Sequence, residues 1–142
     1  MLRHSSRLLS IFSASRLSQP PTHGYELSEL SDEQVLPEFL DVHREAVVHV
    51  IVGNGADCPL TNKVTSVLHH TPLGNPKDVK LALLHGDAAE RLIKEQCIMA
   101  LPTTLIYFRG KLMDRVVGTR VRELMVKSRF ILRNNDISPF SV

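Results

Sequence analysis

The sequence predicts an α/β fold in which a mixed β-sheet is covered by helices on both faces. Two observations carry this prediction. Apolar, β-prone runs alternate with segments of helical periodicity, which is typical of parallel strands joined by crossover helices. The last two apolar runs are separated only by a short turn that contains glycine, which predicts a terminal antiparallel hairpin. The chain of 142 residues is therefore expected to form one domain, a βαβ unit with a terminal ββα unit.

The first 22 residues have the composition of an organellar targeting sequence. They contain three arginines, six serines and no acidic residue. Because transit peptides are rich in Arg and Ser and poor in acids, we expect residues 1–22 to be a mitochondrial presequence and the protein to reside in the matrix. An incidental disordered tail is the alternative. We expect the folded domain over residues 24–134, followed by a flexible tail over residues 135–142.

The folded part is expected to open with a short strand, a helix and a central strand. Tyr25–Leu30 is the short strand. Ser31, with Gln34 three residues on, predicts the cap of a helix that carries Phe39 inward. The β-branched run Val47–Val52 is typical of a strand buried on both faces of a sheet.

The next helix begins at a cysteine. A loop over residues 53–57 follows the central strand, and Pro59 suits the first position of a helix, which makes Cys58 the N-cap. The apolar residues at helical spacing are Leu60, Val64, Val67 and Leu68. The segment over residues 71–76 contains two prolines and a glycine and ends this helix.

A third strand and a third helix follow. Val79–Leu84 is the strand. Asp87 and Glu90 have the spacing of a capping box for a helix that runs through Gln96. We expect Cys97, at the end of this helix, to pack in the core.

A hairpin and a final helix complete the domain. The hairpin runs from Leu101 to Gly118, and Pro102 is expected at the first residue of its first strand, because a proline deeper in a sheet removes a ladder donor. Thr119 is predicted to cap the last helix, and Asn134 is predicted to end it.

From Cys58 to the last helix, the sequence resembles the thioredoxin superfamily. The residues that carry the resemblance are Cys58, Asp87, Leu101-Pro102-Thr103, Gly110 and Gly118. The separation between Cys58 and Pro102, 102 − 58 = 44 residues, is similar to that in thioredoxins. The resemblance implies a thioredoxin-like fold, a cis peptide bond before Pro102 and a site at the start of the helix that follows Cys58.

The same comparison shows where the chain departs from thioredoxins. Their Cys-Gly-Pro-Cys motif is replaced by Cys58-Pro59-Leu60-Thr61. Thr61 thus stands at the position of the second, resolving cysteine. A hydroxyl there cannot attack a mixed disulfide and release the product, as a second thiolate does. The buried acid and lysine of thioredoxins fall on Val52 and Leu83. Dithiol reductase activity is therefore not expected.

The favoured functional hypothesis is a protein-interaction module. Beside a cis-proline, the backbone groups of Leu101 can be left open to pair with an extended peptide as an added strand. The expected binding residues are Pro59, Leu60, Thr61, Leu101, Pro102 and Thr103, with Met99 in the apolar rim. We expect a protein or peptide partner and no cofactor.

The first alternative is monothiol thiol–disulfide exchange through Cys58. A helix N-terminus stabilises a thiolate, although the adjacent Asp57 opposes this. Glutathione would then serve as co-substrate in place of the missing second cysteine. A metal site is not expected, because the adjacent His69 and His70 diverge on a helix.

The second alternative is a structural subunit of a mitochondrial assembly such as the ribosome. It is based on a net charge of +5 between residues 109 and 136, from eight basic and three acidic side chains, which could contact nucleic acid. The basic residues are Arg109, Lys111, Arg115, Arg120, Arg122, Lys127, Arg129 and Arg133. No membrane span is expected, since the apolar runs are far shorter than a bilayer requires.

Overall fold

A five-stranded mixed sheet forms the centre of the molecule, as the sequence predicts. The structure is a computed structural model that describes residues 24–55 and 57–139, so the predicted presequence lies outside the described residues. The strands are β1 (Leu27–Glu29), β2 (Val47–Gly53), β3 (Val79–His85), β4 (Thr103–Phe108) and β5 (Lys111–Val117). Their order is β1-β3-β2-β4-β5. The first three are parallel, whereas β4 runs antiparallel to β2 and β5 antiparallel to β4.

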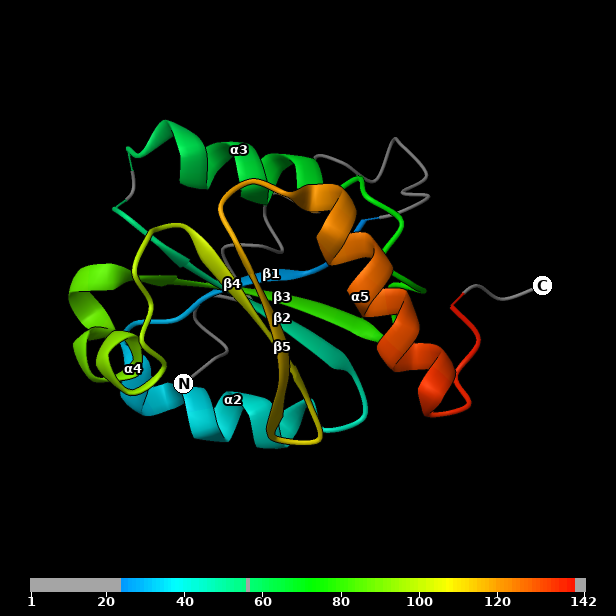
Figure 1. The fold of residues 1–142 in the computed structure, drawn as a ribbon. Coiled ribbons are helices and arrows are strands. Elements are labelled where there is room, and N and C mark those ends of the chain that lie inside the picture. The colour runs from blue at the N-terminus through cyan, green and yellow to red at the C-terminus, as the bar shows by residue number, and fades with distance from the viewer. Residues whose placement is uncertain (1–23, 56, 140–142) are drawn as a thin grey trace.

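Helices cover both faces of this sheet, and each face has its own apolar core. The helices are α2 (Leu36–Val42), α3 (Pro59–Leu68), α4 (Glu90–Glu95) and α5 (Val121–Asn134), with 3-10 turns η1 (Glu33–Val35) and η2 (Gly86–Ala88). Figure 1 shows α3 and α5 on one side of the sheet and α2 and α4 on the other. The two clusters of buried residues follow the same division. The predicted α/β architecture is confirmed.

Strand β2 is the central strand, and all seven of its residues are buried. Its one polar ring, His49, lies with Nε2 3.0 Å from the Ser128 hydroxyl of α5, which in turn donates to the carbonyl of Leu73 at 3.1 Å. Burial lowers the pKa of His49 to about 3, because charging a ring without access to water is costly. His49 is therefore a neutral hydrogen-bonding residue of the core.

Two helix starts differ from the sequence prediction. At η1 the cap is Asp32 and not Ser31, since the Asp32 carboxylate accepts from the backbone N–H of Gln34 at 2.8 Å. Helix α5 begins after Arg120, without a side-chain cap, and not from a Thr119 cap. In both cases the predicted residue lies one position outside the turn that its side chain would need to cap.

The predicted cap of α4 is also wrong. Asp87 lies in η2 and does not cap the helix, and the N-cap position, Ala89, offers no side-chain acceptor. The acceptor comes instead from Glu33, whose carboxylate accepts from the N–H groups of Arg91 at 3.1 Å and Leu92 at 2.6 Å. A residue 58 positions away in the sequence therefore performs the work of an N-cap.

Cys97 is exposed, so the prediction that it packs in the core is wrong. Its φ angle of 52° is left-handed, and the N–H of the next residue, Ile98, donates to the carbonyl of Ile93 at 2.9 Å. These are the features of a Schellman motif, in which the left-handed residue lies just beyond the helix end. Cys97 points to solvent because the chain reverses there, while Ile98 turns inward and is buried.

The last helix ends at Asn134, as predicted, and in the same type of motif. Asp136 has a φ of 59°, and the N–H of Ile137 donates to the carbonyl of Leu132 at 2.9 Å. Ile137 also packs against the core. The part of the predicted tail nearest to α5 is therefore held by hydrogen bonds and packing.

Candidate functional site

The candidate site lies at the end of β2, where the loop over residues 54–58 leads into α3. Cys58 is the N-cap of α3 and Pro59 occupies the first turn, as the sequence predicts. The side chain of Cys58 is partly exposed and forms no disulfide. A partly accessible sulfur at the start of a ten-residue helix is in a position to react.

Thr61, where the resemblance would place a second cysteine, is buried and faces the sheet. Its hydroxyl oxygen accepts from the backbone N–H of Asn54 at 3.2 Å. A Cβ atom added to Gly53 would overlap with Thr61 Cγ2, so the two residues are in close contact. Thr61 therefore ties the first turn of α3 to the end of β2.

The same threonine stabilises a thiolate at Cys58. The thiol makes no hydrogen bond as a side-chain cap, but backbone and hydroxyl donors near its sulfur favour the ionised form. The N–H of Thr61, followed by the Thr61 hydroxyl and the N–H of Leu60, lowers the pKa of Cys58 below its ordinary value. This is the physical basis for reactive cysteines at helix N-termini.

The Leu101–Pro102 segment lies beside this helix start. Its peptide bond is cis, and the pairing of Val52 with Thr103 places the segment next to the end of β2. The Leu101 side chain lies over Gly86, where an added Cβ would be 2.9 Å from Leu101 Cδ1. Among the described residues, none is hydrogen-bonded to the backbone N–H or C=O of Leu101.

Of the predicted binding residues, some are open to solvent and others support them from below. Leu60 is 52 % exposed, and Met99 is 92 % exposed. Pro102 and Thr103 are buried, and the Thr103 hydroxyl donates to the carbonyl of Ala100 at 2.6 Å. A partner could therefore contact Leu60, Met99 and Leu101, while Pro102 and Thr103 hold the shape of the loop.

Three of the basic side chains in the stretch over residues 109–136 form ion pairs. Arg109 lies 3.7 Å from Glu45 and Arg120 lies 3.4 Å from Glu123. Lys127 lies 3.0 Å from Asp114 and 3.1 Å from Glu123. Arg115 donates to the carbonyl of Gln96 at 2.6 Å. Asp114 and Glu123 are already counted in the net charge of +5, so only the pairing of Arg109 with Glu45 lowers it further, and nucleic-acid contact stays a prediction.

No group of three or more His, Cys, Asp or Glu side chains within residues 24–55 and 57–139 could hold a metal ion. No helix in that part of the chain is long and apolar enough to cross a membrane.

Solved structures of thioredoxins are similar to this chain over most of its length. One from Trypanosoma brucei brucei has a TM-score of 0.61 at 15% identity and covers 81% of this chain and 98% of its own. A thioredoxin from Nicotiana alata has a TM-score of 0.61 at 18% identity, covering 76% and 94%. Thioredoxin f from spinach chloroplast has a TM-score of 0.62 at 14% identity, covering 77% and 96%. The chain has a thioredoxin-like fold.

No family model and no curated protein sequence matches the chain. The thioredoxin-like fold thus agrees with the resemblance carried by Cys58, Pro102 and the hairpin glycines, although at these identities the likeness concerns the fold alone. The sequence correctly predicted Cys58 as the N-cap of α3 but did not indicate Gly53 and Asn54 as the residues that Thr61 contacts. The signal that could have indicated close packing there is a glycine at the end of a buried strand.

Proposed function

We propose that this thioredoxin-like domain is a protein-interaction module that binds an extended segment of a partner protein beside Leu101. The observation that carries the proposal is that no residue within 24–55 and 57–139 forms a hydrogen bond to the Leu101 backbone, while Leu60 and Met99 are exposed. An extended peptide gains affinity from main-chain pairing and specificity from pockets for its side chains. Neither contribution requires a second cysteine.

A peptide selection tests this proposal without knowledge of the natural partner. Random peptides displayed on phage would be selected on the full chain carrying Cys58→Ser and Cys97→Ser, so that covalent capture by either free thiol is excluded. We expect enriched sequences whose affinity falls about tenfold or more in Leu60→Asp and Met99→Asp variants. Val42→Asp is the matched control, because Val42 is 61 % exposed on α2. Equal losses in all three variants, or no enrichment, would contradict the proposal.

A second candidate function is monothiol exchange with glutathione, which the lowered pKa of Cys58 favours. The Cys58 thiolate would attack the glutathione sulfur of a glutathionylated protein, forming a Cys58–glutathione disulfide and releasing the protein thiolate. A second glutathione thiolate would then attack that disulfide. The products are free Cys58 thiolate and glutathione disulfide, so electrons and atoms balance.

The pH dependence of Cys58 alkylation tests this second candidate. In a Cys97→Ser background, only Cys58 can react with iodoacetamide. We expect its rate to reach half its plateau at a lower pH than for glutathione itself. Thr61→Val removes the hydroxyl donor and should move this midpoint to higher pH. A midpoint at or above that of glutathione, unchanged by Thr61→Val, would exclude an activated thiol.

We also propose a mitochondrial location, supported by the composition of residues 1–22. A fusion of residues 1–30 to a fluorescent protein tests it by imaging and by protease protection in isolated mitochondria. Replacing Arg3, Arg7 and Arg16 with Glu provides the control, because import requires the positive charge. A cytosolic signal from the unaltered fusion would overturn the assignment.

A further inference from the structure

The outer strand β5 contains an irregularity that changes which side chains face α5. Pairing with β4 shifts between Ile106 and Tyr107, which face Asp114 and Leu112, so Met113 has no partner on β4. An extra residue of this kind is a β-bulge. Met113 and its neighbour Asp114 consequently both line a pocket against α5, whereas Leu112 packs with the core of the opposite face.

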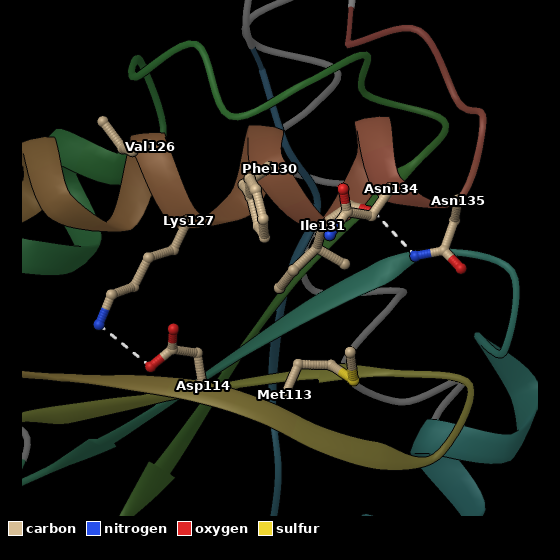
Figure 2. A pocket seen from close by; sticks show the side chains of 8 residues that line it. All are labelled: Met113, Asp114, Val126, Lys127, Phe130, Ile131, Asn134 and Asn135. Atoms are coloured by element: carbon tan, nitrogen blue, oxygen red, sulfur yellow. Dashed lines mark hydrogen bonds and ion pairs between the residues drawn. The ribbon is translucent and has the colours of Figure 1, made fainter.

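The pocket between β5 and α5 is small, open and largely apolar. Its volume is about 220 Å³, below the roughly 300–1,000 Å³ of small-molecule sites but of a size for one large side chain. Figure 2 shows Met113 on β5 opposite Phe130 and Ile131 on α5. Phe130 is 62 % exposed and Met113 43 % exposed, while Ile131 is buried. Exposed apolar side chains that gather around one pocket, here Met113, Val126 and Phe130, are typical of a binding surface.

Polar contacts bound the pocket at both ends without filling it. At one end Lys127 Nζ lies 3.0 Å from Asp114, and at the other the Asn135 amide donates to the carbonyl of Ile131 at 2.8 Å. Lys127 also pairs with Glu123 at 3.1 Å. The acids near the pocket are thus already paired with a cation.

The outer face of α5 extends this apolar surface and has a positive residue at each end. Arg122, Val126, Phe130 and Arg133 follow the spacing that places residues on one side of a helix, and all four are exposed. Within the described residues, neither Arg122 nor Arg133 forms an ion pair. The two arginines are 133 − 122 = 11 positions apart, or about 16 Å along the helix.

We propose that this α5–β5 face binds an acidic amphipathic helix of a partner protein. One large apolar side chain of the partner occupies the pocket between Met113 and Phe130, and carboxylates near the two ends of its helix face Arg122 and Arg133. A partner helix of about three turns spans this distance. The bulge at Met113 disrupts the outer edge of β5, which disfavours the addition of a strand there and favours a helix laid across α5.

Charge also favours an acidic partner helix over two other occupants of this face, the chain's own N-terminal segment and a second copy of the chain. The chain's own N-terminal segment carries Arg3, Arg7 and Arg16 and no acid over residues 1–22, so it would meet the arginines of α5 with like charge. A second copy packed antiparallel on the same helix would bring Arg122 of one chain near Arg133 of the other. An acidic partner removes this repulsion. The face shares no residue with the binding edge proposed beside Leu101.

Designed peptides test the proposal directly on the full chain. The probe is a fluorescein-labelled helical peptide of about 16 residues, with Leu and Phe on one face and Glu near both ends. One control peptide has Lys in place of each Glu, and another has Ser in place of Leu and Phe. Fluorescence anisotropy should show the first peptide binding at least tenfold more tightly than either control, with affinity falling as salt is raised.

Variants of the protein then locate the site. Phe130→Ser should weaken the acidic peptide about tenfold or more, and Arg122→Glu with Arg133→Glu should do the same. The matched controls are Val42→Ser, an exposed apolar residue on α2, and Lys63→Glu, an exposed cation on α3. Neither should change the affinity. Circular dichroism and thermal unfolding would verify that each variant is folded.

Three results would overturn the proposal. Equal binding of the Glu and Lys peptides would show that the arginines do not select the partner. Dimerisation in sedimentation experiments that is lost in Phe130→Ser would make a second copy the occupant. Tight binding of a single-stranded RNA homopolymer that depends on Arg122 and Arg133 but not on Phe130 would assign the face to nucleic acid.

Discussion

Helices α3 and α4 begin at the same edge of the sheet, after the parallel strands β2 and β3. A side chain caps the first turn of α4, whereas no side chain caps the first turn of α3. The N–H groups of Arg91 and Leu92 in α4 are bound by the Glu33 carboxylate. At α3, Cys58 makes no side-chain cap hydrogen bond. One helix start is closed by a distant carboxylate, while the other has no side-chain cap.

The C-terminal end of α4 is closed as well. The Schellman motif around Cys97 satisfies carbonyls of the last turn, and Arg115 of β5 donates to the carbonyl of Gln96 at 2.6 Å. Contacts from η1 and β5 therefore hold α4 at both ends. The comparison shows that a side chain can cap a helix start at this edge of the sheet, as Glu33 does for α4. No side chain caps α3 at Cys58, so the N–H groups of its first turn stay available for binding or chemistry.

The largest expected effect comes from breaking the contact between α3 and β2. In Gly53→Ala the new methyl group would overlap with the buried Thr61 side chain, so we expect a loss of about 2 kcal/mol in the free energy of unfolding. Urea denaturation measures it. Adding Thr61→Ser, which removes Cγ2, should recover part of that loss. A stable Gly53→Ala single variant would show that α3 can move away from β2 at little cost.

Opening the start of α4 should have the next largest effect. Glu33→Ala leaves two N–H groups of the first turn without their acceptor, which should cost about 1–2 kcal/mol of stability. Glu38→Ala, an exposed acid of α2, is the control and should change stability by less than about 0.5 kcal/mol. If the two variants unfold at the same urea concentration, Glu33 does not cap α4.

The C-terminal end of α4 gives a smaller effect of opposite sign. Cys97 adopts a left-handed φ of 52°, which is unfavourable for a residue with a Cβ atom. Cys97→Gly relieves this and should raise the free energy of unfolding by about 0.5–1 kcal/mol. Cys97→Ser keeps the Cβ and serves as the control. Equal stability of the two variants would mean that the turn carries no strain.

Closing α3 is the last and smallest test. Cys58→Ser supplies a hydroxyl oxygen, a good N-cap acceptor, and should raise the midpoint of thermal unfolding by about 2 °C. Cys58→Ala has no acceptor and should give no such rise. A midpoint for the serine variant at or below that of the alanine variant would indicate that the N–H groups of the first turn are not free to donate to a capping oxygen.

Prediction from the sequence succeeded where the signal is local. The run Val47–Val52 identified the central strand, and Pro59 after Cys58 identified the start of α3, because strand propensity and N-terminal proline act over a few residues. The prediction failed at Asp87, whose spacing to Glu90 suggested a cap for α4, because the distant Glu33 carboxylate binds the first-turn N–H groups instead. It also failed at Cys97, where burial was expected from residue type and the exposed position follows from the reversal of the chain.

By itself, the sequence determined the strand and helix order, the thioredoxin-like fold through the spacing of Cys58 and Pro102, and the loss of the second thiol at Thr61. Only the tertiary structure decided that Thr61 packs on Gly53, that Glu33 closes α4 and that a bulge turns Met113 toward Phe130. The reason is physical. Periodicity and spacing record neighbours within a turn or along a strand, whereas these contacts join residues that only the packing of the sheet and its helices brings together.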